Sequence, residues 1–265
     1  MSNADNFSGK LSLNERRNLL TGILIMAFLL SVLAVPTEKG IMHTGGWATL
    51  QRLITSLLHP DLSADLLKLA FSSSLLTFSY ALISLSLALV GAFFLSLFAS
   101  GILFPSLVLQ GSARAMLGFL RAIHELIWAW FFVAAVGLSP IGALVALAIP
   151  YTGYLGKIFA DILQNVPQKP ILALRESGAN RWQLLCYGYL PQAMPAMLSY
   201  TMYRLECAIR SSSVLSFVGL GGIGMQIQLS LQDLKYEQIW TFLGFLILMI
   251  VLIDRWSYAV RRRIK

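Results

Sequence analysis

Long uninterrupted apolar runs constrain this chain more than any other feature. Runs of about 20 apolar residues cross a bilayer as helices, because a helix satisfies its own backbone hydrogen bonds in hydrocarbon. With 57% hydrophobic and only 12% charged residues, the chain needs lipid as its solvent. We therefore expect an all-α integral membrane protein of about six transmembrane helices, with spans at 19–36, inside 66–103, at 119–138, 141–160, 192–218 and 239–256.

The second run sets the orientation. It is too long for one ordinary span and slightly short for two, and Lys68 is its only charge. If it forms one long helix, both termini are cytoplasmic and most of the 20 Lys and Arg residues fall on cytoplasmic segments, as the positive-inside rule requires. The first run follows Arg16 and Arg17 and exceeds a typical signal-peptide core, so we expect an uncleaved helix. The organisation is then a cytoplasmic tail at 1–18 and a permease domain at 19–265.

Two local patterns refine this arrangement. Ser72, Ser79 and Ser86 recur every seven residues, which predicts one face where another helix backbone packs closely. The segment 137–140, Gly-Leu-Ser-Pro, leaves only a tight external turn, so the third and fourth spans are expected to form an antiparallel hairpin.

The cytoplasmic segment 161–191 is the longest polar interruption in the second half of the chain. Its middle predicts two short helical pieces broken at Gly178, with Leu190 and Pro191 as a stop. A helix here with Leu, Trp and Ala on one side and Arg on the other can lie along the inner membrane surface. It either anchors the loop there or contacts a partner.

This segment resembles the coupling motif of ABC importer permeases, which reads Glu-Ala-Ala, three residues, Gly, nine residues, Ile, one residue, Leu, Pro. Gly178, Leu190, Pro191 and Ala173 match the motif. The departures are Leu172 for Glu, Leu174 for the second Ala and Gly188 for Ile, so the acidic contact is either lost or taken over by Glu176.

Flanking segments are similar to the phosphonate-importer permease within that class. They are Ala-Leu-Arg-Glu-Ser-Gly-Ala-Asn-Arg at 173–181, Tyr-Gly-Tyr-Leu-Pro-Gln at 187–192, Ser-Tyr-Thr-Met-Tyr-Arg-Leu-Glu-Cys-Ala-Ile-Arg at 199–210 and Val-Gly-Leu-Gly-Gly-Ile-Gly at 218–224. The resemblance implies a type I importer in the bacterial inner membrane. Its parts would be two permease copies, as a homodimer, two ATPase subunits and an external binding protein.

In that assembly the ATPase uses ATP and Mg²⁺, and this chain binds no cofactor and is not an enzyme. The resemblance also assigns the ATPase-coupling residues, which would be Ala173, Glu176, Gly178, Ala179, Leu190 and Pro191. The expected substrates are phosphonates or related phosphorus oxyanions. Permeases for phosphite, phosphate esters, methionine or a metal remain alternatives.

Charged residues in the fifth span are candidates for the translocation path, since a charge in hydrocarbon is costly unless it is paired or faces water. Arg204, Glu206 and Arg210 lie there, and Glu125 lies in the third span. Glu206 and Arg210 share a helix face and either form an ion pair or line a path in which guanidinium binds an anionic substrate. Glu125 either pairs with Arg204 or caps its helix at the headgroup level.

The glycines 219, 221, 222 and 224 superficially match a dinucleotide-binding fingerprint, but they follow a membrane helix and open no βαβ unit. We expect a sharp turn or re-entrant segment at the external mouth. In the resembled family this segment lies near the external gate, which would consist of Gly219, Gly221, Gly222 and Gly224.

Other functions lack the residues they need. His43 and His59 have no metal-ligand spacing, Cys186 and Cys207 are expected to be packing residues, and no nucleophile accompanies a base. No nucleic-acid partner is expected, because the position of the basic residues along the chain fits a membrane surface. The strongest rival is a proton-coupled carrier with a relay through Glu125, Glu206 and Arg204, which would work without an ATPase.

Overall fold

The computed structural model describes residues 13–34, 46–216, 219 and 221–264, and all regular structure in these residues is helical. The all-α class is confirmed. The chain divides into two compact units, Met1–Arg52 and Leu53–Lys265. The first unit holds α1 (Leu13–Leu33), and α2 (Gly46–Ser56) begins in it. Most of the expected tail at 1–18 lies outside the described residues, as does His43.

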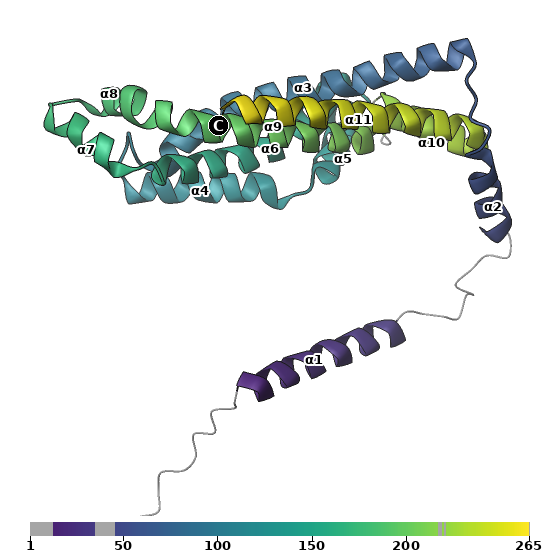
Figure 1. The fold of residues 1–265 in the computed structure, drawn as a ribbon, viewed down its shortest axis with the longest axis horizontal. Coiled ribbons are helices and arrows are strands. Elements are labelled where there is room, and N and C mark those ends of the chain that lie inside the picture. Colours follow the sequence, from purple (N-terminus) through teal and green to yellow (C-terminus); the bar gives the residue numbers. More distant parts are fainter. Residues whose placement is uncertain (1–12, 35–45, 217–218, 220, 265) are drawn as a thin grey trace, which may run out of the picture. The chain divides into compact units, whose positions relative to one another are not determined.

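The larger unit is a bundle of helices that run mostly along one direction (Figure 1). Helices α7 and α8 lie at one end of it and α10 lies toward the other, while α3, α6, α9 and α11 run between them (Figure 1). The elements are α3 (Ala64–Ser100), α4 (Leu107–Ala122), α5 (Glu125–Val136), α6 (Pro140–Gln164), α7 (Gln168–Glu176), α8 (Arg181–Gln183), the π-helix η1 (Leu184–Tyr189), α9 (Leu190–Leu215), α10 (Ile223–Gln232) and α11 (Tyr236–Ile264).

The second apolar run forms one helix, α3, of 37 residues, as the orientation argument predicts. Small residues on its buried face let α6 approach closely: Ala81, Ala88 and Ala92 are fully buried and pack in one cluster with residues of α6. The predicted packing face at Ser72, Ser79 and Ser86 is wrong for this chain. Those three hydroxyls bond to carbonyls of their own helix and lie on its more exposed side.

The expected third span at 119–138 is also wrong as a single helix. The chain breaks at Ile123 and His124, and α4 and α5 meet there with a bend of 83°. His124 adopts an extended backbone, and its Nδ1 accepts a hydrogen bond from the backbone N–H of Leu126, which caps α5. The predicted reversal at 137–140 is present, because Gly137 has φ +79° and Ser139 caps α6.

Length and composition identify three described helices that can cross a membrane, namely Ala64–Ser100, Pro140–Gln164 and Tyr236–Arg263. The bent pair α4–α5 makes a fourth if it counts as one span. The described apolar part of α1, Arg17–Leu33, is shorter than a full span, and α9 is not among the helices that qualify. The count of six spans and the cytoplasmic termini therefore remain predictions.

The stop expected at Leu190 and Pro191 is wrong. Helix α8, η1 and α9 follow one another without a gap, and Gln183, Leu184, Tyr189 and Leu190 all have right-handed helical backbone. A π-helical turn directly before Pro191 explains this continuity, because wider i→i+5 hydrogen bonding leaves space for a residue without an N–H.

Candidate coupling and translocation site

The cytoplasmic segment forms two helices broken at Gly178, as its sequence predicts. Gly178 has φ +87°, a conformation that glycine adopts without strain, and it separates α7 from α8. Helix α8 then begins with a capping box, in which Asn180 accepts from the backbone N–H of Gln183 and the Gln183 side chain accepts from the backbone N–H of Asn180.

The expected coupling residues lie on both sides of this break. Ala173 and Glu176 are exposed on α7, Gly178 is exposed at the turn, and Ala179 is half-buried. Leu190 and Pro191 lie farther along, at the start of α9, and so do not belong to the tip itself. The tip adds an apolar side chain that the motif does not include, since Trp182 is 60% exposed at the start of α8.

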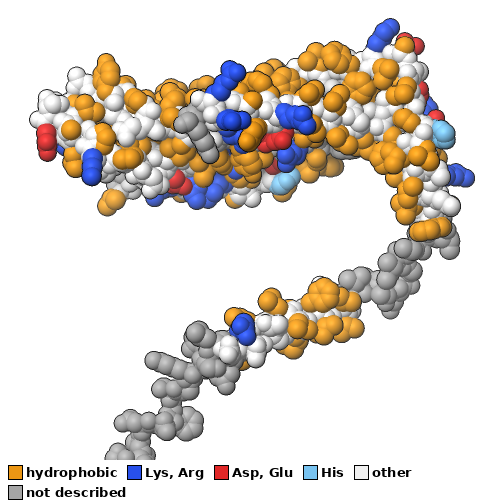
Figure 2. Space-filling model, viewed as in Figure 1, with side chains coloured by type: hydrophobic (Ala, Val, Ile, Leu, Met, Phe, Trp, Pro, Cys, Tyr) orange, Lys and Arg blue, Asp and Glu red, His pale blue; other side chains and the backbone are white. Residues whose placement is uncertain are grey.

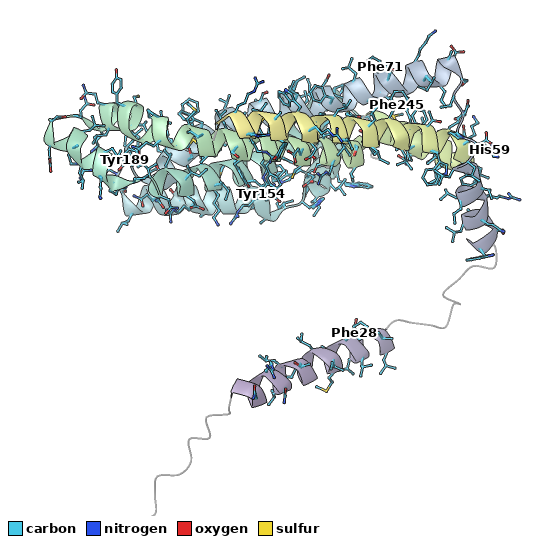
Figure 3. The ribbon with its side chains drawn as sticks, viewed as in Figure 1. Phe28, His59, Phe71, Tyr154, Tyr189 and Phe245 are labelled. Carbon is cyan, nitrogen blue, oxygen red and sulfur yellow. The ribbon has the colours of Figure 1, made fainter. Side chains whose placement is uncertain are left out.

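Arg204 lies in a cage of tyrosines between α9 and α6. Its guanidinium carbon is 4.3 Å from the ring centre of Tyr154 and 5.2 Å from that of Tyr200, and Tyr203 lies 5.7 Å away. Its Nε and Nη2 both donate to the Tyr200 hydroxyl oxygen. Tyr154, labelled in the middle of the bundle in Figure 3, thus offsets part of the cost of burying this charge. The expected pairing with Glu125 is not among the described contacts.

Glu206 forms an ion pair, but not with Arg210. Arg261 Nη2 on α11 donates to Glu206 Oε1 at 2.8 Å, and the side chains are 25% and 8% exposed. Basic side chains follow the carboxyl-terminal part of α11, where they gather near the middle of the bundle (Figure 2). Glu206 therefore lies level with the basic end of α11 rather than deep in an apolar layer.

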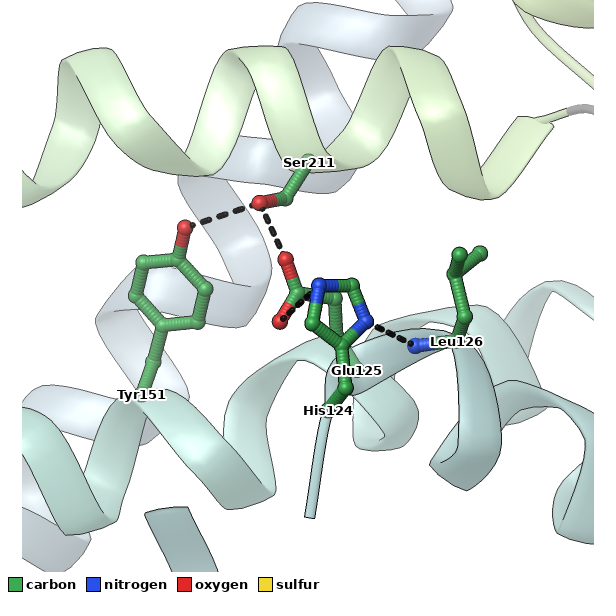
Figure 4. A network of polar contacts seen from close by, with 5 residues as sticks. All are labelled: His124, Glu125, Leu126, Tyr151 and Ser211. Carbon is green, nitrogen blue, oxygen red and sulfur yellow. Dashed lines mark hydrogen bonds and ion pairs between the residues drawn. The ribbon is translucent and has the colours of Figure 1, made fainter. Parts of the chain in front are cut away.

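Glu125 belongs to a third polar network, shown in Figure 4. Its Oε1 accepts a 2.6 Å hydrogen bond from Ser211 Oγ on α9, and Ser211 in turn accepts from the Tyr151 hydroxyl on α6. His124 Nε2 lies 3.8 Å from the other carboxylate oxygen. The network joins α5, α6 and α9 directly beside the bend, so it holds the bend in place.

Arg210 differs from the other three charged residues. Its side chain is exposed, and across the described part of the chain no hydrogen bond or ion pair engages its guanidinium. It lies on a stripe of α9 with Tyr203, Cys207 and Val214, none of which is fully buried. Of the four residues predicted to line a path, the structure engages Arg204, Glu206 and Glu125 in contacts within the chain and leaves Arg210 open.

A cavity of about 690 Å³ opens between α6, α9 and α11 below the tyrosine cage. Its lining includes Ile158, Ser199, Tyr200, Tyr203 and Arg261. Sequence reasoning found neither the tyrosine cage nor Arg261. The partners of Tyr154 and Arg261 are distant along the chain. The only local signal is the spacing of Tyr200, Tyr203 and Arg204, which places two rings within one helical turn of the guanidinium.

The glycine run forms the predicted sharp turn. Gly219, Gly221 and Gly222 have φ between +85° and +94°. The turn packs on α3, because the Thr77 hydroxyl oxygen accepts from the backbone N–H of Ile223 and the Thr77 carbonyl accepts from Ser212 Oγ. A Cβ on Gly224 would lie 2.0 Å from the carbonyl oxygen of Ser213, so only glycine fits against α9 there.

The remaining candidate ligands do not gather. The described residues hold no group of three or more His, Cys, Asp or Glu side chains able to bind a metal. Both cysteines are free, and Cys207 packs against the core. Cys186 is exposed, so the expectation that it is a packing residue is wrong within this chain.

The sequence matches the family model described as "Binding-protein-dependent transport system inner membrane component" over residues 19–265. It is 30% identical over 247 residues to the putative phosphite transport system permease protein HtxC of Stutzerimonas stutzeri, covering 93% of this chain and 87% of that protein. It is 35% identical over 161 residues to the phosphite transport system permease protein PtxC of the same species, covering 61% of this chain but only 58% of PtxC. It is also 33% identical over 119 residues to the putative cryptic phosphonate transport system permease protein PhnE2 of Escherichia coli K12, covering 45% of this chain and 98% of PhnE2.

Solved structures agree on the fold. A chain of the MetNI methionine ABC transporter superposes with a TM-score of 0.67 at 19% identity, covering 77% of this chain and all of that one. A chain of an amino acid ABC transporter superposes with a TM-score of 0.64 at 17% identity, covering 74% and 94%. The protein thus belongs to the binding-protein-dependent transport system inner membrane components, as a multi-pass inner-membrane protein with the type I ABC importer permease fold and with phosphonate-type and phosphite-type permeases among its relatives.

Proposed function

We propose that this chain forms half of the transmembrane channel of an ATP-driven importer for phosphonates or related phosphorus oxyanions. The names of its relatives support this substrate class, since the similar proteins include permeases of phosphite and phosphonate transport systems. Import of phosphite itself fits the same evidence. Methionine is less supported, because a probable D-methionine permease is 27% identical over only 35% of this chain, and the methionine transporter structure is similar in fold at 19% identity.

In this proposal two copies of the chain assemble with two ATPase subunits and an external binding protein. ATP and Mg²⁺ are bound by the ATPase, and this chain contributes the channel and the docking segment. The bundle crosses the membrane with both termini in the cytoplasm, so that segment 161–191 faces the ATPase. The basic carboxyl end of α11 then lies on the cytoplasmic side, as the positive-inside rule requires.

The continuous helix from α8 through η1 to α9 is the observation that carries the coupling mechanism. A displacement of the exposed Trp182 on α8 passes to α9 without crossing a loop, and the turn at Gly178 connects Ala173 and Glu176 on α7 to the same continuous helix. Helix α9 contacts three of its neighbours through separate side chains. Arg204 contacts Tyr154 of α6, Glu206 contacts Arg261 of α11, and Ser211 contacts Glu125 of α5. Movement of α9 would therefore rearrange the bundle as a whole and alternate its access.

Arg210 is the residue that we assign to the translocation path. Its free guanidinium matches two oxygens of a phosphonate or phosphite in a bidentate geometry. Arg204, Glu206 and Glu125 form the wall behind it, where each is engaged by protein groups. The glycine turn at 219–224 is proposed as the external gate, since its packing on Thr77 ties it to α3 and α9.

The rival proton relay is less supported. Glu125 contacts Ser211, and Glu206 contacts Arg261, so in the described residues the two carboxylates belong to separate networks. Arg204 contacts neither of them and is held by tyrosines. A carrier of this kind would also have no use for an exposed docking tip at Gly178.

Growth on a phosphonate or on phosphite as sole phosphorus source tests the proposal in a strain that lacks its own importer and expresses the matching ATPase and binding protein. The intact chain should support growth. Gly178→Val should not, because a β-branched residue is strained at φ +87°, whereas Gly178→Asn should, because Asn tolerates this conformation. Space is not the cause, since a Cβ at Gly178 meets nothing within 4 Å.

The outcomes separate the two parts of the proposal when membrane levels of all three proteins are equal. Failure of the intact chain on both phosphorus sources would overturn the substrate class. Growth with Gly178→Val equal to growth with the intact chain would overturn coupling through this segment.

A further inference from the structure

A cavity of about 210 Å³ lies where α4 meets α6, beside the end of α3. Three cationic side chains and one anionic side chain line it, namely Arg114, Arg121, Lys157 and Asp161. None of these four residues lines the cavity beside the tyrosine cage, and none takes part in the proposed path. An excess of positive charge around a cavity favours an anionic ligand.

Two glycines of α6 let α4 pack closely beside this cavity. A Cβ on Gly153 would lie 2.9 Å from both the backbone nitrogen of Arg121 and the carbonyl oxygen of Leu117. A Cβ on Gly156 would lie 2.5 Å from a methyl group of Leu117. The two helices therefore touch backbone to backbone, and this contact fixes Arg121 beside Lys157.

Arg114 is held in place by a second set of contacts. Its Nε donates to the carbonyl oxygen of Ala99 at 3.1 Å, and its Nη2 donates to Gln164 Oε1 at 2.8 Å. Gln164 is itself fixed, because its Nε2 donates to the carbonyl oxygen of Ser100. A guanidinium has five N–H donors, so Arg114 keeps several for a ligand while its position is set by the protein.

The other charges of the cavity have no such engagement. The ion pairs formed by the described residues include none with Arg121, Lys157 or Asp161. One carboxylate cannot balance three cations, and cationic groups at a helix interface are stabilised by a counter-ion. A phosphate group offers the oxygens that two guanidinium groups and one ammonium group can share.

From this geometry we propose that the cavity between α4 and α6 is a binding site for a phosphate group. In the orientation of the proposed function, it faces the cytoplasmic leaflet, one to two helical turns before α6 ends at Gln164. Basic pockets between helices on this side of a membrane bind anionic lipid headgroups. The same chemistry would accept a soluble phosphate or phosphonate that has reached the cytoplasm, and the experiment separates these two sources.

The test uses the purified complex of this chain with its ATPase partner in nanodiscs. In the first arm, phosphatidylglycerol is titrated into phosphatidylcholine discs, and native mass spectrometry counts the phosphatidylglycerol that stays bound. The double variant Arg121→Gln with Lys157→Gln should weaken retention roughly thirty-fold, since two charges are lost near the headgroup. The matched control, Arg262→Gln with Arg263→Gln, removes equal charge from exposed positions on α11 and should retain the lipid.

Asp161→Asn supplies a test of opposite sign. It removes the one repulsive charge from the cavity, so it should tighten retention severalfold, an effect that a merely structural disturbance would not produce.

In the second arm, inorganic phosphate or methylphosphonate is added to discs of phosphatidylcholine alone, and the thermal unfolding midpoint is followed. The site binds a soluble oxyanion if the anion raises the unfolding midpoint, the cavity variants abolish that rise, and the same variants leave lipid retention unchanged. The proposal fails if neither arm responds to the cavity variants, or if the α11 control changes binding equally. Growth on a phosphorus source is measured separately, so loss of import with intact lipid binding overturns the proposed function and leaves this site standing.

Discussion

Leu174 on α7 and Gly188 in η1 face each other across the coupling segment. A Cβ built on Gly188 would lie 3.2 Å from Cδ1 of Leu174 and 2.7 Å from Cδ1 of Ile171. These two facing positions are also two of the departures from the coupling motif, which has a small Ala at the first and a large Ile at the second. The chain has exchanged large for small across one contact, so the total volume of the packing is kept.

We predict that each single reversion destabilises this segment and that the double reversion recovers part of the loss. Gly188→Ile overpacks the contact and should cost about 1–3 kcal/mol. Leu174 is half-buried, so Leu174→Ala leaves a gap at this contact and should cost about 1–2 kcal/mol. The double variant should be more stable than Gly188→Ile alone. Thermal unfolding of the purified complex measures all three.

Gly118→Ala is the control for a glycine substitution, because a Cβ at Gly118 meets nothing within 4 Å. Additive losses in the double variant would show that the two positions do not compensate. Stimulation of ATPase activity by the binding protein, measured on the same samples, should follow the same order as stability if the contact holds α7 in its docking position.

The pair between Glu206 and Arg261 predicts an asymmetric double-mutant cycle. Arg261→Gln leaves a buried carboxylate without its cation and should cost about 1–3 kcal/mol, below the value for a fully buried pair because Arg261 is 25% exposed. Adding Glu206→Gln removes that carboxylate and should restore part of the loss. Unfolding midpoints of the four proteins give the coupling, and Arg262→Gln serves as the control. Equal midpoints for Arg261→Gln and Arg262→Gln would refute this role of the pair.

The sequence predicts best where the signal is local. The long helix α3, the break at Gly178 and the turn at the glycine run follow from apolar length and from φ values that only glycine adopts easily. The break between α4 and α5 does not follow, because Ile123 and His124 are ordinary residues in an apolar stretch. Two contacts lie at the bend: the His124 side chain caps α5, and Ser211 on α9 bonds to Glu125.

Partners of the charged residues were the least predictable part of the site. Helix periodicity predicts that Glu206 pairs with Arg210, four residues away. In the structure Glu206 pairs instead with Arg261, which lies 55 residues along the chain. The stop expected at Pro191 is wrong because a π-helical turn precedes the proline. No single residue type in the sequence indicates a π-helical turn.

Asp61 predicts a dependence of stability on acid pH. The backbone N–H of Ser63 donates to Asp61 Oδ1 at 3.0 Å, and this bond lowers the pKa of Asp61 below its ordinary value of 3.8. A carboxyl with a lowered pKa stabilises the folded state above its unfolded pKa and loses that contribution as pH falls through the folded one. The backbone carbonyl of Asp61 also accepts a hydrogen bond from Thr241 Oγ1, and this bond connects the segment before α3 to α11.

Asp61→Asn should therefore lower the unfolding midpoint at pH 6, and the difference from the intact chain should shrink as pH falls below about 4. Asp65→Asn, which removes a carboxylate from the first turn of α3, is the control. A difference that stays constant from pH 6 to pH 3 would contradict a role for the ionised carboxylate.

Arg210 gives the most direct test of the translocation path. Arg210→Ala removes the one exposed guanidinium of the four predicted path residues. It should reduce uptake roughly ten- to a hundred-fold, because the charge-assisted contact with the moving anion is lost. Arg210→Lys keeps the charge but not the bidentate geometry, so its uptake should lie between that of the intact chain and that of Arg210→Ala. Arg255→Ala, which removes an exposed guanidinium from α11, should leave uptake unchanged.

Uptake of labelled phosphonate into vesicles that contain the complex and its binding protein measures this series, and ATPase activity is recorded on the same vesicles. If Arg210 lines the path, Arg210→Ala lowers uptake while the complex stays assembled and continues to hydrolyse ATP, because the coupling segment is untouched. Uptake by Arg210→Ala equal to that of the intact chain would remove Arg210 from the path. Equal losses of uptake and hydrolysis would instead place Arg210 in the coupling between the docking tip and α9.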